Sequence, residues 1–380
     1  MSAYAVAVEK IMSITSPLLS RHGAVPDEGA DAGIAAHYGD PAQEQRALER
    51  GRAVVDLSNR GVVTVTGPDR LSWLHTLSSQ QLTGLPAGVT TETLLLSVQG
   101  RIEFDLLVTD DGERTWLLSD VGQHEELARW LDSMRFMLRV EVADVTADWA
   151  VLGATLDPAA APAPLADAAV RFDDPWPAIG PGGFAYTVGE DHPGANWRWS
   201  QYLVPRAGLA AAVDTLADAG IGLAGNSAAE ALRIAAWRPR YARDVDEKTI
   251  PHELDLIRTG VHLAKGCYKG QETVARVHNL GHPPRRLVFL HLDGSEHTLP
   301  AVGAEVVAGE RTVGRVTSVA QHGEMGPIAL AVIKRNVDPG APLVVVDGDA
   351  RYAAAQEIIV APDAGQVVGR PAGLLNTRRG

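Results

Sequence analysis

The hydrophobic pattern of the chain changes at Arg286, and this change limits the folds that the chain can adopt. From there to residue 361 the sequence consists of short β-rich runs, among them RLVFLHL, RTVGRVTSVA and PLVVVDG, separated by turn residues at regular spacing. This pattern is typical of a small β-barrel. Because 380 residues suffice for two or three domains, we expect residues 1–285 and 286–361 to fold separately and residues 362–380 to form a disordered tail.

The residues before Arg286 combine strand and helix patterns. GVVTVT (61–66) is β-branched and leads directly into a helix whose leucines repeat at helical spacing, and residues 94–120 predict three short strands with a hairpin at Asp111-Gly112. Further helices are expected over 41–50, 123–138, 207–219 and 227–237. Strands joined by hairpins as well as by helices favour an α+β fold over a doubly wound parallel sheet.

Composition argues against several classes of partner. The net charge of −13 comes without a basic block, so nucleic acid is not expected as a main partner. No apolar run approaches the ~20 residues of a membrane span, and Glu9-Lys10 interrupts the apolar N-terminus, so we expect neither a signal peptide nor a membrane partner and place the protein in the cytoplasm. The single cysteine, Cys267, rules out an intramolecular disulfide and a zinc site built from cysteines alone.

The octapeptide KGCYKGQE (265–272) is the most unusual local motif. No phosphate-binding loop, dinucleotide fingerprint after a strand, nucleophile elbow or HExxH motif accompanies it. Two lysines flank Cys267, and ETVARV after it predicts a helix start, two features that favour an exposed, reactive thiolate. Two alternatives remain open at this level: Cys267 is a small buried hydrophobe, or it forms a three-ligand metal site with His278 and His282.

A second cluster lies in residues 232–256, where arginines alternate with aromatic residues. Guanidinium and aromatic groups together can hold a planar heterocycle and an anionic tail. The simpler alternative is a surface ion-pair network between the arginines and neighbouring acids. The residues concerned are Arg233, Arg238, Arg240, Arg243, Trp237 and Tyr241, with Asp244, Asp246 and Glu247 as the acids.

These residues carry a family resemblance. KGCYKGQE resembles the signature of the YgfZ family, the folate-binding relatives of the glycine-cleavage aminomethyltransferase (T-protein) that support iron–sulfur cluster assembly or repair. Residues 37–69 resemble the opening block of the T-protein, and residues 233–256 resemble its folate-side block. The resemblance implies an α+β, T-protein-like ring of three domains, in which two interleaved α+β units precede a C-terminal β-barrel.

The resemblance also implies a function and partners. The cofactor would be tetrahydrofolate or a one-carbon derivative, and the protein partners would be iron–sulfur enzymes or assembly proteins. The alternative is a folate-dependent aminomethyltransferase or demethylase of T-protein type.

The resemblance assigns roles to individual residues as well. Cys267 would be the functional thiol, surrounded by Lys265, Gln271 and Glu272. Arg233 and Tyr241 would face the folate, and Asp105 and Gln201 would contact the pterin.

The sequence departs from the T-protein pattern at several of its acids. Where T-proteins carry two adjacent aspartates, this chain has Phe104-Asp105, which leaves Asp105 or Glu103 as the acid near the reacting nitrogen. Gln201 occupies the position of a pterin-binding glutamate of T-proteins, and Ala235 occupies the position of another of their acids. Two tryptophans of bacterial YgfZ relatives fall near Arg60 and Ala229.

Overall fold

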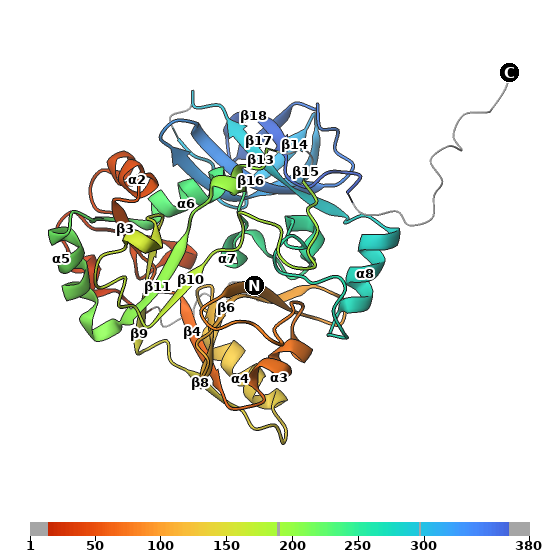
Figure 1. The fold of residues 1–380 in the computed structure, drawn as a ribbon. Coiled ribbons are helices and arrows are strands. Elements are labelled where there is room, and N and C mark those ends of the chain that lie inside the picture. The colour runs from red at the N-terminus through yellow and green to blue at the C-terminus, as the bar shows by residue number, and fades with distance from the viewer. Residues whose placement is uncertain (1–13, 188–190, 296–297, 365–380) are drawn as a thin grey trace.

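The computed structural model describes residues 14–187, 191–295 and 298–364. Two five-stranded sheets and a closed barrel form three lobes, which meet around the short helix α7 (Tyr241–Asp244) in Figure 1. This arrangement confirms the expected α+β fold with a C-terminal barrel. No helix of the described residues is long and apolar enough to cross a membrane.

The first lobe is built on the sheet β10-β11-β9-β3-β12, in which only the β12–β3 pair is parallel. Its strands are β10 (Val170–Asp173), β11 (Ser200–Pro205), β9 (Trp149–Ala154), β3 (Ala53–Asp56) and β12 (Gly222–Ala224). Successive side chains point to opposite faces of a strand, so Val54 packs with α5 (Leu209–Asp218) and Val55 packs with α2 (Pro41–Glu49) and α6 (Asn226–Ala235). A short hairpin of β1 (Val25–Pro26) and β2 (Ala35–His37) precedes α2.

The second lobe is the antiparallel sheet β5-β6-β7-β4-β8. Its strands are β5 (Thr90–Leu96), β6 (Ile102–Asp110), β7 (Arg114–Ser119), β4 (Gly61–Thr66) and β8 (Glu141–Asp144). The helices α3 (Arg70–Leu77) and α4 (His124–Met134) cover the outer face, where Phe104 and Leu106 are buried. The period of two therefore turns Asp105 and Leu107 toward the inner face and the centre of the molecule.

The two α+β lobes are interleaved in the chain. The path enters the first sheet at β3, builds the whole second sheet from β4 to β8, and returns to the first sheet at β9. The predicted strands and helices of this region are confirmed, with boundary shifts of a few residues. The largest shift is at α4, which ends at Met134 because the chain turns at Phe136, whose φ is 46°.

The third lobe is a closed barrel of strand order β13-β16-β15-β14-β17-β18. The strands are β13 (Arg285–Leu292), β14 (Glu305–Ala308), β15 (Arg311–His322), β16 (Gly326–Lys334), β17 (Leu343–Asp347) and β18 (Ala350–Ile358). The helix α8 (Gln271–Leu280) precedes the barrel, and short 3-10 helices lie at Pro17–Ser20, Gly29–Asp31, Pro158–Ala160, Pro193–Asn196, Arg206–Gly208 and Pro251–Leu254. Most of the expected tail, from residue 365 on, lies outside the described residues.

Candidate functional site

A central cavity of about 110 Å³ lies between the inner faces of the two sheets and α6. Both lobes and the α6–α7 segment contribute to its wall. Four of the residues to which the resemblance assigns a role line it: Asp105 on β6, Gln201 on β11, Arg233 on α6 and Tyr241 on α7. Arg60 and Ala229, where the resemblance places the tryptophans of bacterial relatives, line it too.

Two tryptophans form an aromatic part of the cavity wall. Trp197 and Trp199 are stacked, with ring centroids 5.3 Å apart and an angle of 18° between the rings. The indole Nε1 of Trp197 donates to Asp174 Oδ2 at 2.9 Å, which fixes the ring. The cavity therefore offers a flat apolar surface suited to a planar heterocycle.

Three carboxyl groups gather around one guanidinium at the cavity wall. Arg238 Nη2 lies 2.6 Å from Glu92 Oε1, and Arg238 Nε lies 3.1 Å from Asp174 Oδ2. Burial, followed by the charge of Glu92, raises the pKa of Asp105 well above its ordinary value. One cation faces three acids, which disfavours the ionised form of Asp105.

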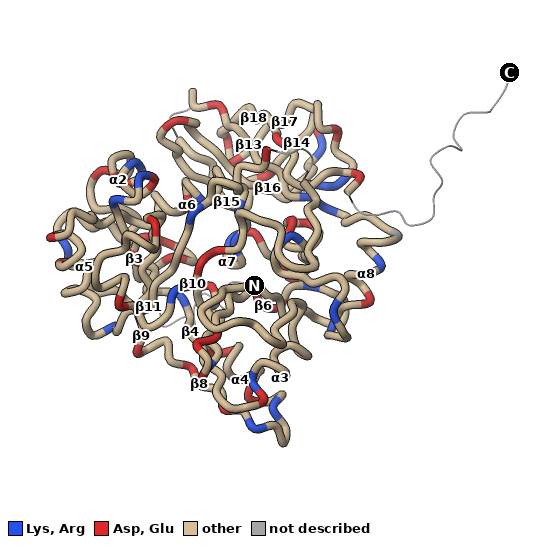
Figure 2. Tube along the Cα trace, in the orientation of Figure 1, with Lys and Arg blue, Asp and Glu red and all other residues tan. Residues whose placement is uncertain are grey.

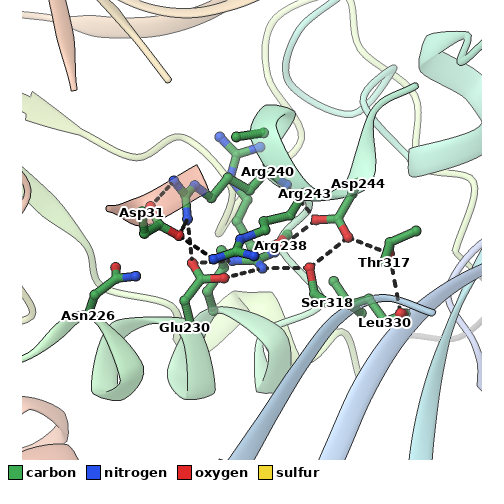
Figure 3. Close-up of polar contacts among 12 residues, drawn as sticks. Asp31, Asn226, Glu230, Arg238, Arg240, Arg243, Asp244, Thr317, Ser318 and Leu330 are labelled. Carbon is green, nitrogen blue, oxygen red and sulfur yellow. Dashed lines mark hydrogen bonds and ion pairs between the residues drawn. The ribbon is translucent and has the colours of Figure 1, made fainter. Parts of the chain in front are cut away.

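Beside this group lies a buried charge cluster in which the two signs balance, and Figure 3 shows part of it. In Figure 2, acidic and basic residues lie along the trace near α7. Arg240 is its centre and binds Asp31 at 2.6 Å, Asp120 at 2.9 Å and Glu230 at 3.2 Å. The members are four guanidinium groups (Arg60, Arg233, Arg240, Arg243) and four carboxylates (Asp31, Asp120, Glu230, Asp244). Buried charges that are paired in this way hold the lobes in one relative position.

Arg233 links α6 to the barrel. Its guanidinium contacts Glu230 at 2.7 Å, Asp244 at 3.0 Å and the Ser318 hydroxyl of β15 at 2.8 Å (Figure 3). Asp244 in turn accepts from Ser318 at 2.8 Å and from Thr317. Arg233 lines the cavity, but protein groups occupy its donors, so its contact with folate stays a prediction. The ion-pair alternative holds for Arg233 and Asp244, although the network is buried and not on the surface.

The octapeptide forms a separate loop outside the cavity wall. Lys265 Nζ donates to the carbonyls of His75, Ser78 and Gln80 at 2.5, 2.6 and 3.0 Å, which ties the loop to the C-terminal end of α3. The Lys265 ammonium group is thus bound to backbone carbonyls, and its role beside the thiol stays a prediction. Cys267 itself is exposed, which contradicts the buried alternative.

The rest of the octapeptide fixes the shape of this loop. Tyr268 is buried with the Lys265 ammonium 5.2 Å from its ring centroid, and Gln271 Nε2 donates to the Lys265 carbonyl at 3.3 Å. Glu272 is exposed in the first turn of α8. None of the octapeptide's side chains is among those that line the cavity, so the loop and the cavity are two distinct places.

The metal alternative for Cys267 is wrong. His278 Nδ1 lies 2.8 Å from the Tyr186 hydroxyl, and His282 Nδ1 lies 2.9 Å from the carbonyl oxygen of Ala364. Across residues 14–187, 191–295 and 298–364, no group of three or more His, Cys, Asp or Glu side chains is placed to hold a metal ion.

Sequence reasoning missed Glu92, Asp174, Trp197 and Trp199. Glu92 had a visible signal, because it is the one charged residue in the apolar strand TTETLLL. Asp174 and the tryptophans lie in and after a Pro- and Gly-rich stretch without periodicity, where no pattern indicates which side chains turn inward. Glu103, the second candidate acid, pairs with Lys269 at 3.0 Å and does not line the cavity.

Comparison with known proteins agrees with this architecture. Residues 17–155 match the family model of the GCVT N-terminal domain. A chloroplastic protein of Arabidopsis thaliana that is named a transferase is 24% identical over 300 residues, covering 76% of this chain and 66% of that relative. The aminomethyltransferase of Streptomyces avermitilis is 25% identical over 354 residues, covering 86% of this chain and 90% of the relative.

The fold comparison is more extensive than the sequence matches. The glycine cleavage system aminomethyltransferase T from Bartonella henselae aligns with a TM-score of 0.70 at 20% identity, covering 92% of this chain and 97% of that one. The two chains therefore share one fold over nearly their whole lengths.

Proposed function

From the T-protein fold and the cavity at its centre, we propose that this protein is a folate-dependent transferase of T-protein type, which binds tetrahydrofolate in the central cavity. One observation carries the proposal. Asp105 and Gln201, which the resemblance places beside the pterin, come from different lobes and line the same cavity together with Trp197 and Trp199. The aminomethyltransferase names of relatives such as that of Streptomyces avermitilis support transfer of an aminomethyl group over the iron–sulfur role.

The cavity wall fits a pterin in its chemistry. Several buried polar atoms of its lining side chains lack a hydrogen-bond partner: Arg60 Nε, Arg238 Nη1 and Asn226 Oδ1. Unpaired buried donors and acceptors are costly unless a ligand or water satisfies them. The volume of about 110 Å³ is somewhat below the ~150 Å³ of a cavity that takes up one benzene ring, so a two-ring pterin requires the lining side chains to move apart.

The lining residues have separable tasks in this proposal. Bound tetrahydrofolate supplies ring nitrogens that take up and release a one-carbon unit. Trp197 and Trp199 offer a surface on which the ring stacks, and the Gln201 amide can donate and accept hydrogen bonds at the pterin edge. Asp105 holds a proton at the cavity wall, and Tyr241, whose pKa burial raises to about 12, stays a neutral hydroxyl.

Calorimetric titration of the reduced protein with tetrahydrofolate tests binding. We expect saturable binding that weakens about tenfold in Gln201→Ala, because a buried hydrogen-bonding partner is lost. Cys267→Ser is the matched control and should bind like the parent protein, since Cys267 does not line the cavity. Absence of binding to the parent protein would refute the proposal. Transfer is tested by formation of methylenetetrahydrofolate from an aminomethylated lipoyl carrier protein.

A second function, iron–sulfur cluster maintenance of the YgfZ type, is favoured by one observation. Cys267 is exposed on a loop that Lys265, Tyr268 and Gln271 fix in shape, away from the cavity. In this alternative the loop presents the thiol to an iron–sulfur enzyme or assembly protein, and Gln271 and Glu272 surround it. Cells that depend on this chain should then lose iron–sulfur enzyme activity with Cys267→Ser, whereas tetrahydrofolate binding stays intact.

A further inference from the structure

We propose that Glu92 is a positioning residue that keeps a proton on Asp105, so that Asp105 faces the ligand of the central cavity as a hydrogen-bond donor. This inference deepens the proposed function. It depends on that function only for the identity of the ligand, tetrahydrofolate.

The sheet register brings the two acids together. In the antiparallel pair β5–β6, Glu92 lies opposite Leu107 and Asp105 lies opposite Leu94. Glu92 and Asp105 are therefore diagonal neighbours on the inner face, within reach of each other's side chains. Both side chains line the central cavity. Two neighbouring carboxyl groups can hydrogen-bond to each other only when one of them carries a proton, because an ionised carboxylate is only an acceptor.

The surroundings decide which acid keeps the proton. Glu92 pairs with Arg238 at 2.6 Å, and its Oε2 accepts from the hydroxyl of Thr259. Asp174 pairs with Arg238 Nε at 3.1 Å and accepts from Trp197 Nε1 at 2.9 Å. The guanidinium of Arg238 makes ion pairs with these two acids, and the described residues show no ion pair to Asp105.

Among the charges of the described residues that act most strongly on Asp105, Arg238 is the one cation. The groups that act on Asp105 are Glu92, Asp174 and Arg238, and Tyr241 faces it from α7 as a hydroxyl. Three carboxyl groups around one guanidinium leave an uncompensated negative charge in a buried site, and a proton removes it at the lowest cost. Asp105 is the acid without a cationic partner, so the proton resides there.

The protonation state determines which ligand atoms the site accepts. A carboxylate at position 105 would select N–H donors, whereas a protonated Asp105 selects an acceptor such as an unprotonated ring nitrogen or a carbonyl oxygen. Glu92, which also lines the cavity, therefore sets the ligand chemistry through the proton on Asp105.

Infrared spectroscopy tests the acid pair without any ligand. The parent protein at neutral pH should show the carbonyl stretch of a protonated carboxyl group, which Asp105→Asn removes. In Glu92→Gln the same band should disappear at a lower pH, because the neighbouring negative charge is gone. Glu103→Gln, on the same strand as Asp105, is the matched control and should leave the band unchanged. A parent protein without the band at neutral pH, or a band that titrates identically in Glu92→Gln, would overturn the proposal.

Ligand binding provides the second measurement. Asp105→Asn keeps an N–H donor of similar shape and should bind tetrahydrofolate within about threefold of the parent protein, whereas Asp105→Ala should bind about tenfold more weakly. Equal weakening in both variants would contradict the donor role. If the infrared band behaves as expected but tetrahydrofolate does not bind to any form, the acid pair stands and the proposed function fails. The two inferences can thus fail separately.

Discussion

Arg240 Nη2 lies 2.6 Å from Asp31 Oδ1, although 209 residues separate them in the chain. Both side chains are buried, and Arg240 also binds Asp120 at the end of β7 and Glu230 on α6. One guanidinium thereby joins the N-terminal segment, the second lobe and the wall of the central cavity. Because a buried charge without its partner is costly, Arg240 supports the position of the lobes together with Arg243 and Arg60, which also pair with Asp31 and Asp120.

Replacing Arg240 by methionine should lower the free energy of unfolding by about 3–5 kcal/mol, because Asp31 and Asp120 would lose a buried counter-charge. Urea denaturation at neutral pH measures the change. The matched control is Arg139→Ala, whose partner Asp69 lies at the surface, and it should leave the free energy of unfolding nearly unchanged. If Arg240→Met lowers the free energy of unfolding no more than the control does, the cluster does not stabilise the fold.

The same cluster should make the protein unstable in acid. Burial by itself would raise the pKa of Glu230, but Arg233 and Arg240 lower it to about 2. A carboxyl group with a lowered pKa stabilises the folded state above its ordinary pKa and loses this contribution as the pH falls through the folded value. We expect the urea midpoint to fall between pH 5 and pH 2. Glu230→Gln should show a smaller fall over this range, and an identical fall would contradict the assignment.

Asp105 should affect stability with the opposite sign. Its pKa is raised by burial and by Glu92, so the folded state binds more protons than the unfolded state above pH 4, and stability decreases as the pH rises. Asp105→Asn removes this decrease. We expect the variant to gain stability over the parent protein by up to about 1.4 kcal/mol per pH unit above pH 4. Thermal unfolding of both proteins from pH 4 to pH 8 measures it, and parallel curves would contradict the raised pKa.

Two glycines of the Cys267 loop should respond differently to alanine. Gly270 has φ of 85°, and a Cβ there would lie 2.6 Å from the carbonyl oxygen of Ser97. Gly270→Ala should therefore cost at least about 1 kcal/mol of unfolding free energy. Gly266 has no heavy atom within 4 Å of an added Cβ, so Gly266→Ala should have little effect. Comparable losses in the two variants would mean that the loop has another conformation.

Lys265 should control the order of the same loop. Its ammonium group donates to three carbonyls at the end of α3, and burial lowers its pKa to about 8. Lys265→Met should destabilise the protein by about 1–3 kcal/mol, because these carbonyls lose their donor. Limited proteolysis should then cut near Cys267 faster than in the parent protein. Lys269→Met, which removes an exposed ion pair with Glu103, is the control and should be cut at the parental rate.

Local sequence patterns were sufficient to predict the helices, the strands and the fold class. The β-branched run at 61–66 is β4 with the same boundaries, and the change of pattern at Arg286 marks the barrel within one residue. These features depend on neighbours in the chain, on turn residues and on the alternation of apolar side chains. These patterns did not show that the Lys265 ammonium group is bound by carbonyls at the end of α3, because the direction of a flanking lysine depends on tertiary structure.

The sequence by itself determined that the chain is an α+β protein with a C-terminal barrel and that Cys267 stands apart in an unusual motif. Only the tertiary structure decided which side chains share the central cavity and which charges are paired. Asp31 meets Arg240, and Glu92 meets Arg238, across more than a hundred residues. Such contacts arise from the packing of whole sheets against one another, and no local periodicity encodes them. Burial then sets the protonation of these groups, because the cost of a charge depends on the surroundings that folding creates.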